Sequence, residues 1–113
     1  MKIRLTFAAT LAASCAAFGT VYEVNVPAGN VQTNFTAAQK TAIAALGAAD
    51  EINKTGGGTL QLTVDTDVKP FKGTIRISDG VYRTLDSGSG KYWFGTMDGP
   101  TIVESGATLC IAT

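Results

Sequence analysis

The chain contains no histidine, which excludes histidine-based catalytic triads and histidine-containing zinc sites. It has two cysteines among 113 residues, Cys15 and Cys110, and the first lies in a segment that we expect to be removed. Cys110 is then alone, so we expect no disulfide framework, and it has no histidine to activate it. Its alternation with Leu109 and Ile111 is typical of a small side chain on a strand.

Excess charge of either sign is also absent, because nine basic residues balance nine acidic ones. No basic patch is available to bind a phosphate backbone, so nucleic acid is not an expected partner. The glycines at 56–58 follow a segment with a helical pattern, whereas a phosphate-binding loop enters a helix. We therefore expect no cofactor.

Carboxylates are the only remaining candidates for metal or acid–base chemistry. Asp65 and Asp67 lie two residues apart in a turn and are candidates for sharing a calcium ion. Calcium takes about six to eight oxygen ligands, so we interpret this pair as solvated turn residues and expect no metal. Asp79, Asp86, Asp98 and Glu104 are candidates for an acid–base pair, but no spacing selects one.

Residues 1–19 have the pattern of a secretory signal peptide. Lys2 and Arg4 precede an apolar run over 5–13, and small residues follow at 14–17 and 19. The run is shorter than the about 20 residues that span a bilayer. A second interpretation is a lipobox at 11–15 with Cys15 lipidated, although its leucine stands one place too early.

The rest of the chain repeats one sequence pattern, a short strand of alternating apolar and polar residues next to a glycine, at 57–62, 72–85 and 99–111. Such a recurrence is typical of a solenoid, whose units bury their apolar faces only by stacking. A strand is also predicted at 20–26, ended by Pro27. Superposing Gly80 on Gly106 predicts three aligned pairs: Ile77 with Val103, Val81 with Ala107, and Leu85 with Ile111.

A different pattern at 36–53 predicts an amphipathic helix. Thr36 and Gln39 have capping-box spacing, and apolar residues recur three and four apart up to Ile52. The helix directly precedes the first glycine-rich strand. We therefore expect it to cap the open edge of a solenoid.

Residues 53–62 read Asn-Lys-Thr-Gly-Gly-Gly-Thr-Leu-Gln-Leu, and 71–77 read Phe-Lys-Gly-Thr-Ile-Arg-Ile before Gly80-Val81. These segments resemble the autotransporter-associated β-strand repeat, and 101–111 resembles the second half of a further copy. The resemblance covers about residues 53–111. It implies a right-handed parallel β-helix passenger that is exported to the surface of a Gram-negative-type bacterium.

We therefore expect a mainly β protein, a β-helix or β-solenoid fragment with an N-terminal amphipathic capping helix. The expected organisation is a signal peptide (1–19), a strand and capping helix (20–56) and solenoid rungs (57–113) that continue beyond the chain. The expected function is non-enzymatic adhesion or display, secreted or on the cell surface. Membrane attachment is expected only through a C-terminal barrel that this sequence lacks. The alternatives are a polysaccharide-active β-helix enzyme and a small carbohydrate-binding module.

Aromatic residues are the best candidates for ligand contact. Tyr92 and Trp93 lie in one short strand with Phe94, and Tyr82 precedes them. Flat rings stack on sugars or anchor a protein partner, so a glycan or a neighbouring surface protein is the expected partner. Alternation would put Tyr92 and Phe94 on one face and Trp93 on the other, and core filling is the competing interpretation.

Overall fold

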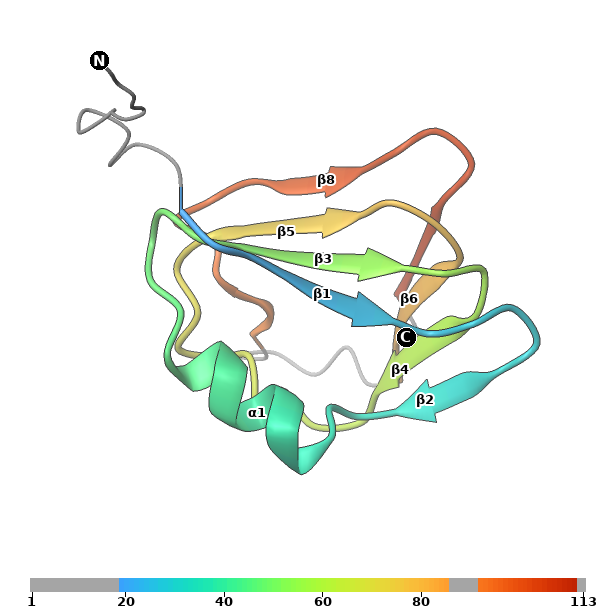
Figure 1. Cartoon of the computed structure of the whole chain (residues 1–113), viewed down its shortest axis with the longest axis horizontal. Helices are drawn as coiled ribbons and strands as arrows, with labels where there is room; N and C mark the ends of the chain where they lie inside the picture. The colour runs from blue at the N-terminus through green and yellow to red at the C-terminus, as the bar shows by residue number, and fades with distance from the viewer. Residues whose placement is uncertain (1–18, 86–91, 112–113) are drawn as a thin grey trace, which may run out of the picture.

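The chain winds into a parallel β-solenoid, as a computed structural model of residues 19–85 and 92–111 shows (Figure 1). This confirms the predicted β-solenoid with an N-terminal helix, although the helix is shorter than predicted. The predicted signal peptide, apart from Gly19, lies outside the described residues, as do residues 86–91 and 112–113. No helix in 19–85 and 92–111 is long and apolar enough to cross a membrane.

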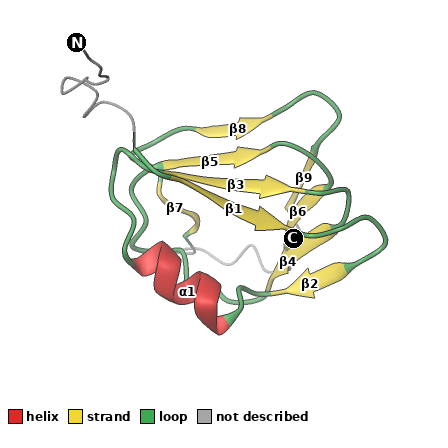
Figure 2. Ribbon diagram, in the orientation of Figure 1, coloured by secondary structure: helices red, strands yellow, loops and turns green. Residues whose placement is uncertain are grey.

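Two four-stranded parallel sheets form two sides of the solenoid (Figure 2). The first sheet has the order β1 (Val21–Asn25), β3 (Glu51–Thr55), β5 (Thr74–Ile77) and β8 (Thr101–Val103). The second has the order β2 (Val31–Thr33), β4 (Thr59–Leu62), β6 (Val81–Thr84) and β9 (Thr108–Ile111). Each turn therefore adds one strand to each sheet, which is why the sequence repeats a strand–corner–strand phrase.

The length of a turn varies along the chain. Paired residues in neighbouring strands of the first sheet are 30, then 23, then 26 residues apart, as in Val21–Glu51, Glu51–Thr74 and Ile75–Thr101. The extra residues of the first turn hold α1 (Ala37–Ala44) on the third side of the solenoid. On that side β7 (Trp93–Thr96) runs beside residue 71, because the amide of Thr96 donates to the Phe71 carbonyl at 2.8 Å.

The core consists of side chains that point inward from alternate positions of each strand. Inward positions of successive turns stack on one another, as in the column Val24, Lys54, Ile77 and Val103 of the first sheet. The second sheet contributes Leu60 and Tyr82 in the same way. Burial of apolar area by this stacking stabilises the fold by about 25 cal/mol per Å². A single turn cannot bury its apolar side chains without its neighbours.

The helix prediction over 36–53 was correct at its start and wrong at its end. Thr36 and Gln39 form the predicted capping box, with the Gln39 amide donating to the Thr36 hydroxyl at 3.2 Å. The helix ends at Ala44, and Glu51 already belongs to β3. The carboxylate of Asp50 accepts from the amides of Gly47 and Thr20, at 2.6 and 2.7 Å, and so fixes a turn before β3.

The predicted alignment of the last two repeats was correct in the first sheet and wrong in the second. Ile77 pairs with Val103 as predicted, but Val81 pairs with Thr108 rather than Ala107. Ile111 likewise pairs with Thr84 rather than Leu85. The reason is a corner of unequal length: three residues separate β5 from β6, and four separate β8 from β9.

Candidate functional site

The outward face of the first sheet carries charged side chains that bridge successive turns. Arg76 of β5 donates from Nε to both carboxylate oxygens of Glu51 at 3.2 Å. Its Nη1 donates to Glu104, which follows β8. Glu104 and then Glu51 raise the pKa of the Arg76 guanidinium by hydrogen bonding. One guanidinium therefore connects three consecutive turns.

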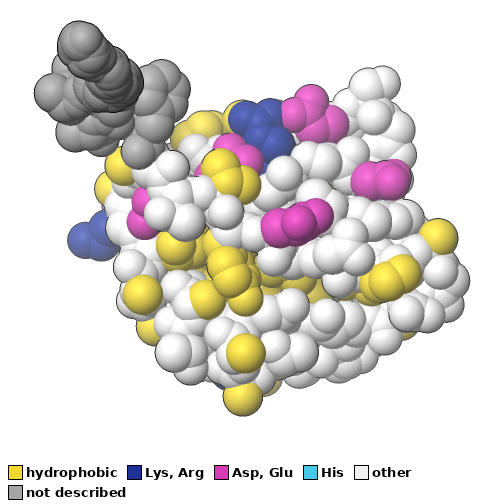
Figure 3. Space-filling view, viewed as in Figure 1, with side chains coloured by type: hydrophobic (Ala, Val, Ile, Leu, Met, Phe, Trp, Pro, Cys, Tyr) yellow, Lys and Arg dark blue, Asp and Glu magenta, His cyan; other side chains and the backbone are white. Residues whose placement is uncertain are grey.

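Neutral side chains continue these contacts on the same face. The Ser78 hydroxyl donates to Asn53 Oδ1 at 2.6 Å. Thr55 accepts from Asn25 Nδ2 at 3.1 Å and donates to Glu23. We call the whole set the polar ladder: Glu23, Asn25, Glu51, Asn53, Thr55, Arg76, Ser78 and Glu104. Figure 3 shows acidic and basic side chains together over these strands. No local sequence motif marks the ladder, although each member stands at an outward position of the alternation.

The remaining candidate carboxylates serve as local turn acceptors. Asp79 Oδ1 accepts from the Gly80 amide at 2.8 Å, and Asp98 Oδ2 accepts from the Thr96 hydroxyl at 2.9 Å. Asp86 lies outside the described residues. Of the four candidates for an acid–base pair, Glu104 is the one that the structure places in the polar ladder.

Two of the three candidate aromatic residues lie in the core. Tyr82 has 0% exposure and Trp93 has 5%, so neither offers a free ring face to a ligand. The Tyr82 hydroxyl donates to the Trp93 carbonyl at 2.7 Å, and its ring lies 5.7 Å from that of Phe94. Burial raises the pKa of Tyr82. Core filling, the competing interpretation, therefore describes these two side chains.

Tyr92 is the exposed member of the candidate trio, at 40%. The ammonium of Lys69 lies 4.9 Å from the centre of its ring, a cation–π distance. Its amide donates to Asp65 Oδ2 at 2.6 Å, which fixes the start of the aromatic segment. Tyr92 is exposed where Trp93 is buried, as the alternation predicts, but Phe94 packs against the core instead of sharing the exposure of Tyr92.

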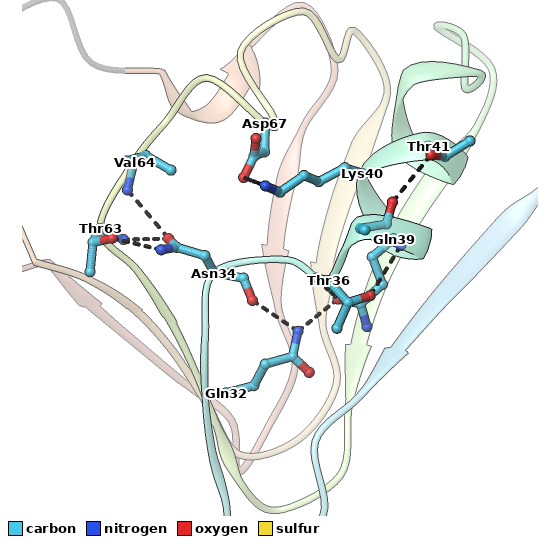
Figure 4. Close-up of polar contacts among 10 residues, drawn as sticks. Gln32, Asn34, Thr36, Gln39, Lys40, Thr41, Thr63, Val64 and Asp67 are labelled. Carbon is cyan, nitrogen blue, oxygen red and sulfur yellow. Dashed lines mark hydrogen bonds and ion pairs between the residues drawn. The ribbon is translucent and has the colours of Figure 1, made fainter.

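Asp65 and Asp67, the pair considered for calcium, make contacts within the protein. Asp65 caps Tyr92, and Asp67 Oδ2 lies 3.9 Å from Lys40 Nζ of α1 (Figure 4). Within 19–85 and 92–111 no group of three or more histidine, cysteine, aspartate or glutamate residues could hold a metal ion.

Polar contacts fix α1 at its end of the solenoid (Figure 4). Gln32 of β2 donates from Nε2 to Gln39 Oε1 at 2.6 Å and to the Asn34 carbonyl at 3.0 Å. Asn34 has a positive φ of 63° and its Nδ2 donates to Thr63 Oγ1 at 2.7 Å. These bonds tie the helix start to both the first and the second turn.

Lys54 is a buried lysine in an apolar column, with 0% exposure. Its Nζ donates to the carbonyls of Thr55, Gly56 and Asp79, at 3.0, 2.7 and 2.9 Å. Burial lowers its pKa, and nearby Asp79 opposes that shift. The lysine of the Lys-Thr-Gly segment at 54–56 therefore hydrogen-bonds to the backbone of two corners, the one after β3 and the one after β5.

The described part of the chain encloses no pocket, so any ligand of these residues would bind to an open face. Comparison of the chain with models of known families, with curated proteins and with solved structures found no match.

Proposed function

We propose that this chain is a non-enzymatic β-solenoid for adhesion or display, secreted or held at a cell surface, and that the polar ladder is its contact face. The observation that carries the proposal is the bridging of three turns by Arg76 through Glu51 and Glu104. A face whose side chains are already fixed loses little conformational entropy when it binds.

The chemistry of the ladder suits a hydroxyl-rich polymer. Amide, hydroxyl, carboxylate and guanidinium groups together offer both donors and acceptors on an open face. An extended glycan needs no cavity, because it can lie along a sheet and contact several turns. A glycan is therefore the proposed ligand class, and a neighbouring surface protein is the alternative partner.

Two features of the sequence support export to the cell surface. Residues 1–19 have the pattern of a signal peptide, and residues 53–81 and 101–111 resemble the autotransporter-associated β-strand repeat. The solenoid fold is the architecture that this resemblance implies. The assignment to a Gram-negative-type envelope is proposed on the resemblance alone.

Binding to a glycan array with two arginine variants tests the proposal. Arg76→Ala should weaken binding at least tenfold, because it removes the group that connects three turns. Arg83→Ala is the matched control, since Arg83 is exposed on the outward face of the second sheet. Equal loss in both variants, or no glycan binding by the unmodified chain, would contradict the assignment of this face.

Tyr92 supports the carbohydrate-binding-module alternative, because its ring is exposed beside Lys69. Tyr92→Ala on the same array separates the two faces: loss there, with Arg76→Ala binding normally, would assign the ligand to Tyr92. The enzyme alternative predicts release of reducing ends or unsaturated products from bound polysaccharide. The proposed function predicts neither product.

A further inference from the structure

The polar ladder contains one regular column of side chains at the carboxyl ends of the strands. Neighbouring strands of the first sheet lie about 4.7–4.9 Å apart, so this column adds one side chain per turn at that spacing. We call it the outer column, and its members are Asn25, Thr55, Ser78 and Glu104. It lies along the side of the solenoid, so its exposure does not depend on what lies beyond either end.

The two hydroxyl groups of the outer column donate their protons within the protein. Thr55 donates to Glu23 of β1, and Ser78 donates to Asn53 Oδ1 of β3 at 2.6 Å. A hydroxyl group has one proton and two lone pairs. Both hydroxyls therefore offer a ligand only acceptor sites.

Carboxylates add further acceptors at both ends of the outer column. Glu23 is exposed beside Thr55, and the side chain of Glu104 is 43% exposed. An ionised carboxylate accepts hydrogen bonds and donates none. The outer column and its neighbours are thus suited to a ligand that donates.

The charge of the polar ladder points the same way. Its three carboxylates and one guanidinium leave a formal net charge of −2. Arg76, the guanidinium, already binds Glu51 through Nε and Glu104 through Nη1. An acidic ligand would therefore meet like charge, and the cation on this face is already paired with two carboxylates.

The other basic residues that the structure describes lie away from the outer column. Lys54 is buried, and Arg83 lies on the outward face of the second sheet. Lys40 belongs to α1, and Lys69 lies over the ring of Tyr92. Lys72 stands two residues before β5, at the opposite end of that strand from Ser78. None of these is placed to neutralise an acidic sugar on the outer column.

We infer that the polar ladder selects glycans by charge: it binds amine-bearing sugars most tightly, uncharged sugars less tightly, and uronic or sulfated sugars least. This ranking rests on the proposed function, because it takes the polar ladder as the glycan-binding face. A protonated amine brings three N–H donors and a positive charge, and hydrogen bonds between ionised partners are the stronger ones. A sugar hydroxyl brings one donor, whereas a carboxylate or sulfate brings acceptors and repulsion.

Binding to matched sets of oligosaccharides tests the ranking. One set consists of β-1,4-linked hexamers of glucosamine, glucose and glucuronate, which share a backbone and differ in charge, and sets with other linkages follow the same design. In every set that binds, the amine-bearing member should bind at least tenfold more tightly than the acidic member. The preference should shrink in 1 M salt, where the screening length falls to about 3 Å.

Glu23→Gln separates the charge of the polar ladder from that of the whole protein. It keeps an acceptor for the Thr55 hydroxyl and removes one negative charge, so the preference for the amine should fall at least threefold. Asp98→Asn is the matched control, because it removes the same charge from an exposed turn outside the polar ladder. It should leave the preference unchanged, and an equal fall in both variants would overturn the inference.

Failure of the ranking and failure of the proposed function give different results. If uncharged sugars bind and Arg76→Ala weakens that binding, but acidic members bind as tightly as amine-bearing ones, the ranking is overturned and the proposed function stands. If no set binds, or if Arg76→Ala leaves the binding of uncharged sugars intact, the assignment of this face fails and the ranking fails with it.

Discussion

Lys54 donates from Nζ to the backbone carbonyl of Asp79 at 2.9 Å, and this bond joins the corner of one solenoid turn to the corner of the next. The same ammonium binds the carbonyls of Thr55 and Gly56 in its own corner. Carbonyls that turn inward at a corner need donors, and here one flexible side chain supplies them. The lysine thus serves the stacking of turns rather than a surface contact.

Lys54→Met should lower the free energy of unfolding by about 1–3 kcal/mol, because partly buried hydrogen bonds to backbone carbonyls are lost. The Thr55 carbonyl keeps its bond from the Val26 amide at 3.0 Å, so the loss falls on Gly56 and Asp79. Urea denaturation measures this loss of stability. Lys72→Met is the control, because Lys72 is exposed. Equal stability of both variants would mean that the cost of burying the ammonium cancels its bonds.

Asp50 should make stability depend on acid pH. Its pKa lies below the ordinary value of 3.8, because the amides of Gly47 and Thr20 stabilise the carboxylate. Because the pKa is lower in the folded state, the ionised Asp50 adds stability at pH values above its unfolded pKa. That stability is lost as the pH falls below about 3.8 toward the pKa of the folded state. Asp50→Asn should melt at a lower temperature at pH 7, and the difference should shrink below pH 3.8. A constant difference across this range would contradict the role of the charge.

The alternation of the strands predicted the solenoid, because inward and outward positions can be read within each segment. The lengths of the corners could not be read in the same way: Gly80 and Gly106 look equivalent in sequence, yet the second corner holds one more residue. Only pairing with the neighbouring strand fixes that register. The error in the second sheet therefore came from contacts that are distant in sequence.

The end of the helix and the polar ladder were missed for related reasons. Alanine-rich periodicity continues to Ile52, but Asp50 binds the amide of Thr20, which lies 30 positions away. Parallel pairing with β1 then outweighs helical propensity, which is a weak prior. Ladder contacts such as Arg76 with Glu51 also join residues 25 apart. No local motif marks them until the length of a turn is known.

Ile43→Asp should uncover the first turn. It places a carboxylate at a position with 2% exposure, against the cluster that contains Val24, and burying an unpaired charge is strongly unfavourable. We expect a loss of about 3 kcal/mol or more and aggregation on heating, since the β1 edge becomes available for pairing. Light scattering during a thermal scan measures this. Ala44→Asp, at the exposed next position, should stay soluble, and an equally soluble Ile43→Asp would show that α1 is not a cap.

Gly80 and Gly106 should respond differently to alanine, although each stands at a corner with a positive φ, of 69° and 89°. A left-handed alanine costs about 1–2 kcal/mol, which is the whole penalty expected at Gly106, where a Cβ meets no described atom within 4 Å. At Gly80 a Cβ would collide with the carbonyl oxygen of Gly58 and would lie 2.7 Å from Lys54 Nζ. Relieving that collision requires separating two turns, because the Gly58 carbonyl also accepts from the Val81 amide at 3.1 Å.

Gly80→Ala should therefore be destabilised by at least about 2 kcal/mol more than Gly106→Ala, as an overpacking cost adds to the backbone cost. Chemical denaturation of the two variants measures the difference. Equal losses would show that the corners of inner and outer turns are packed alike.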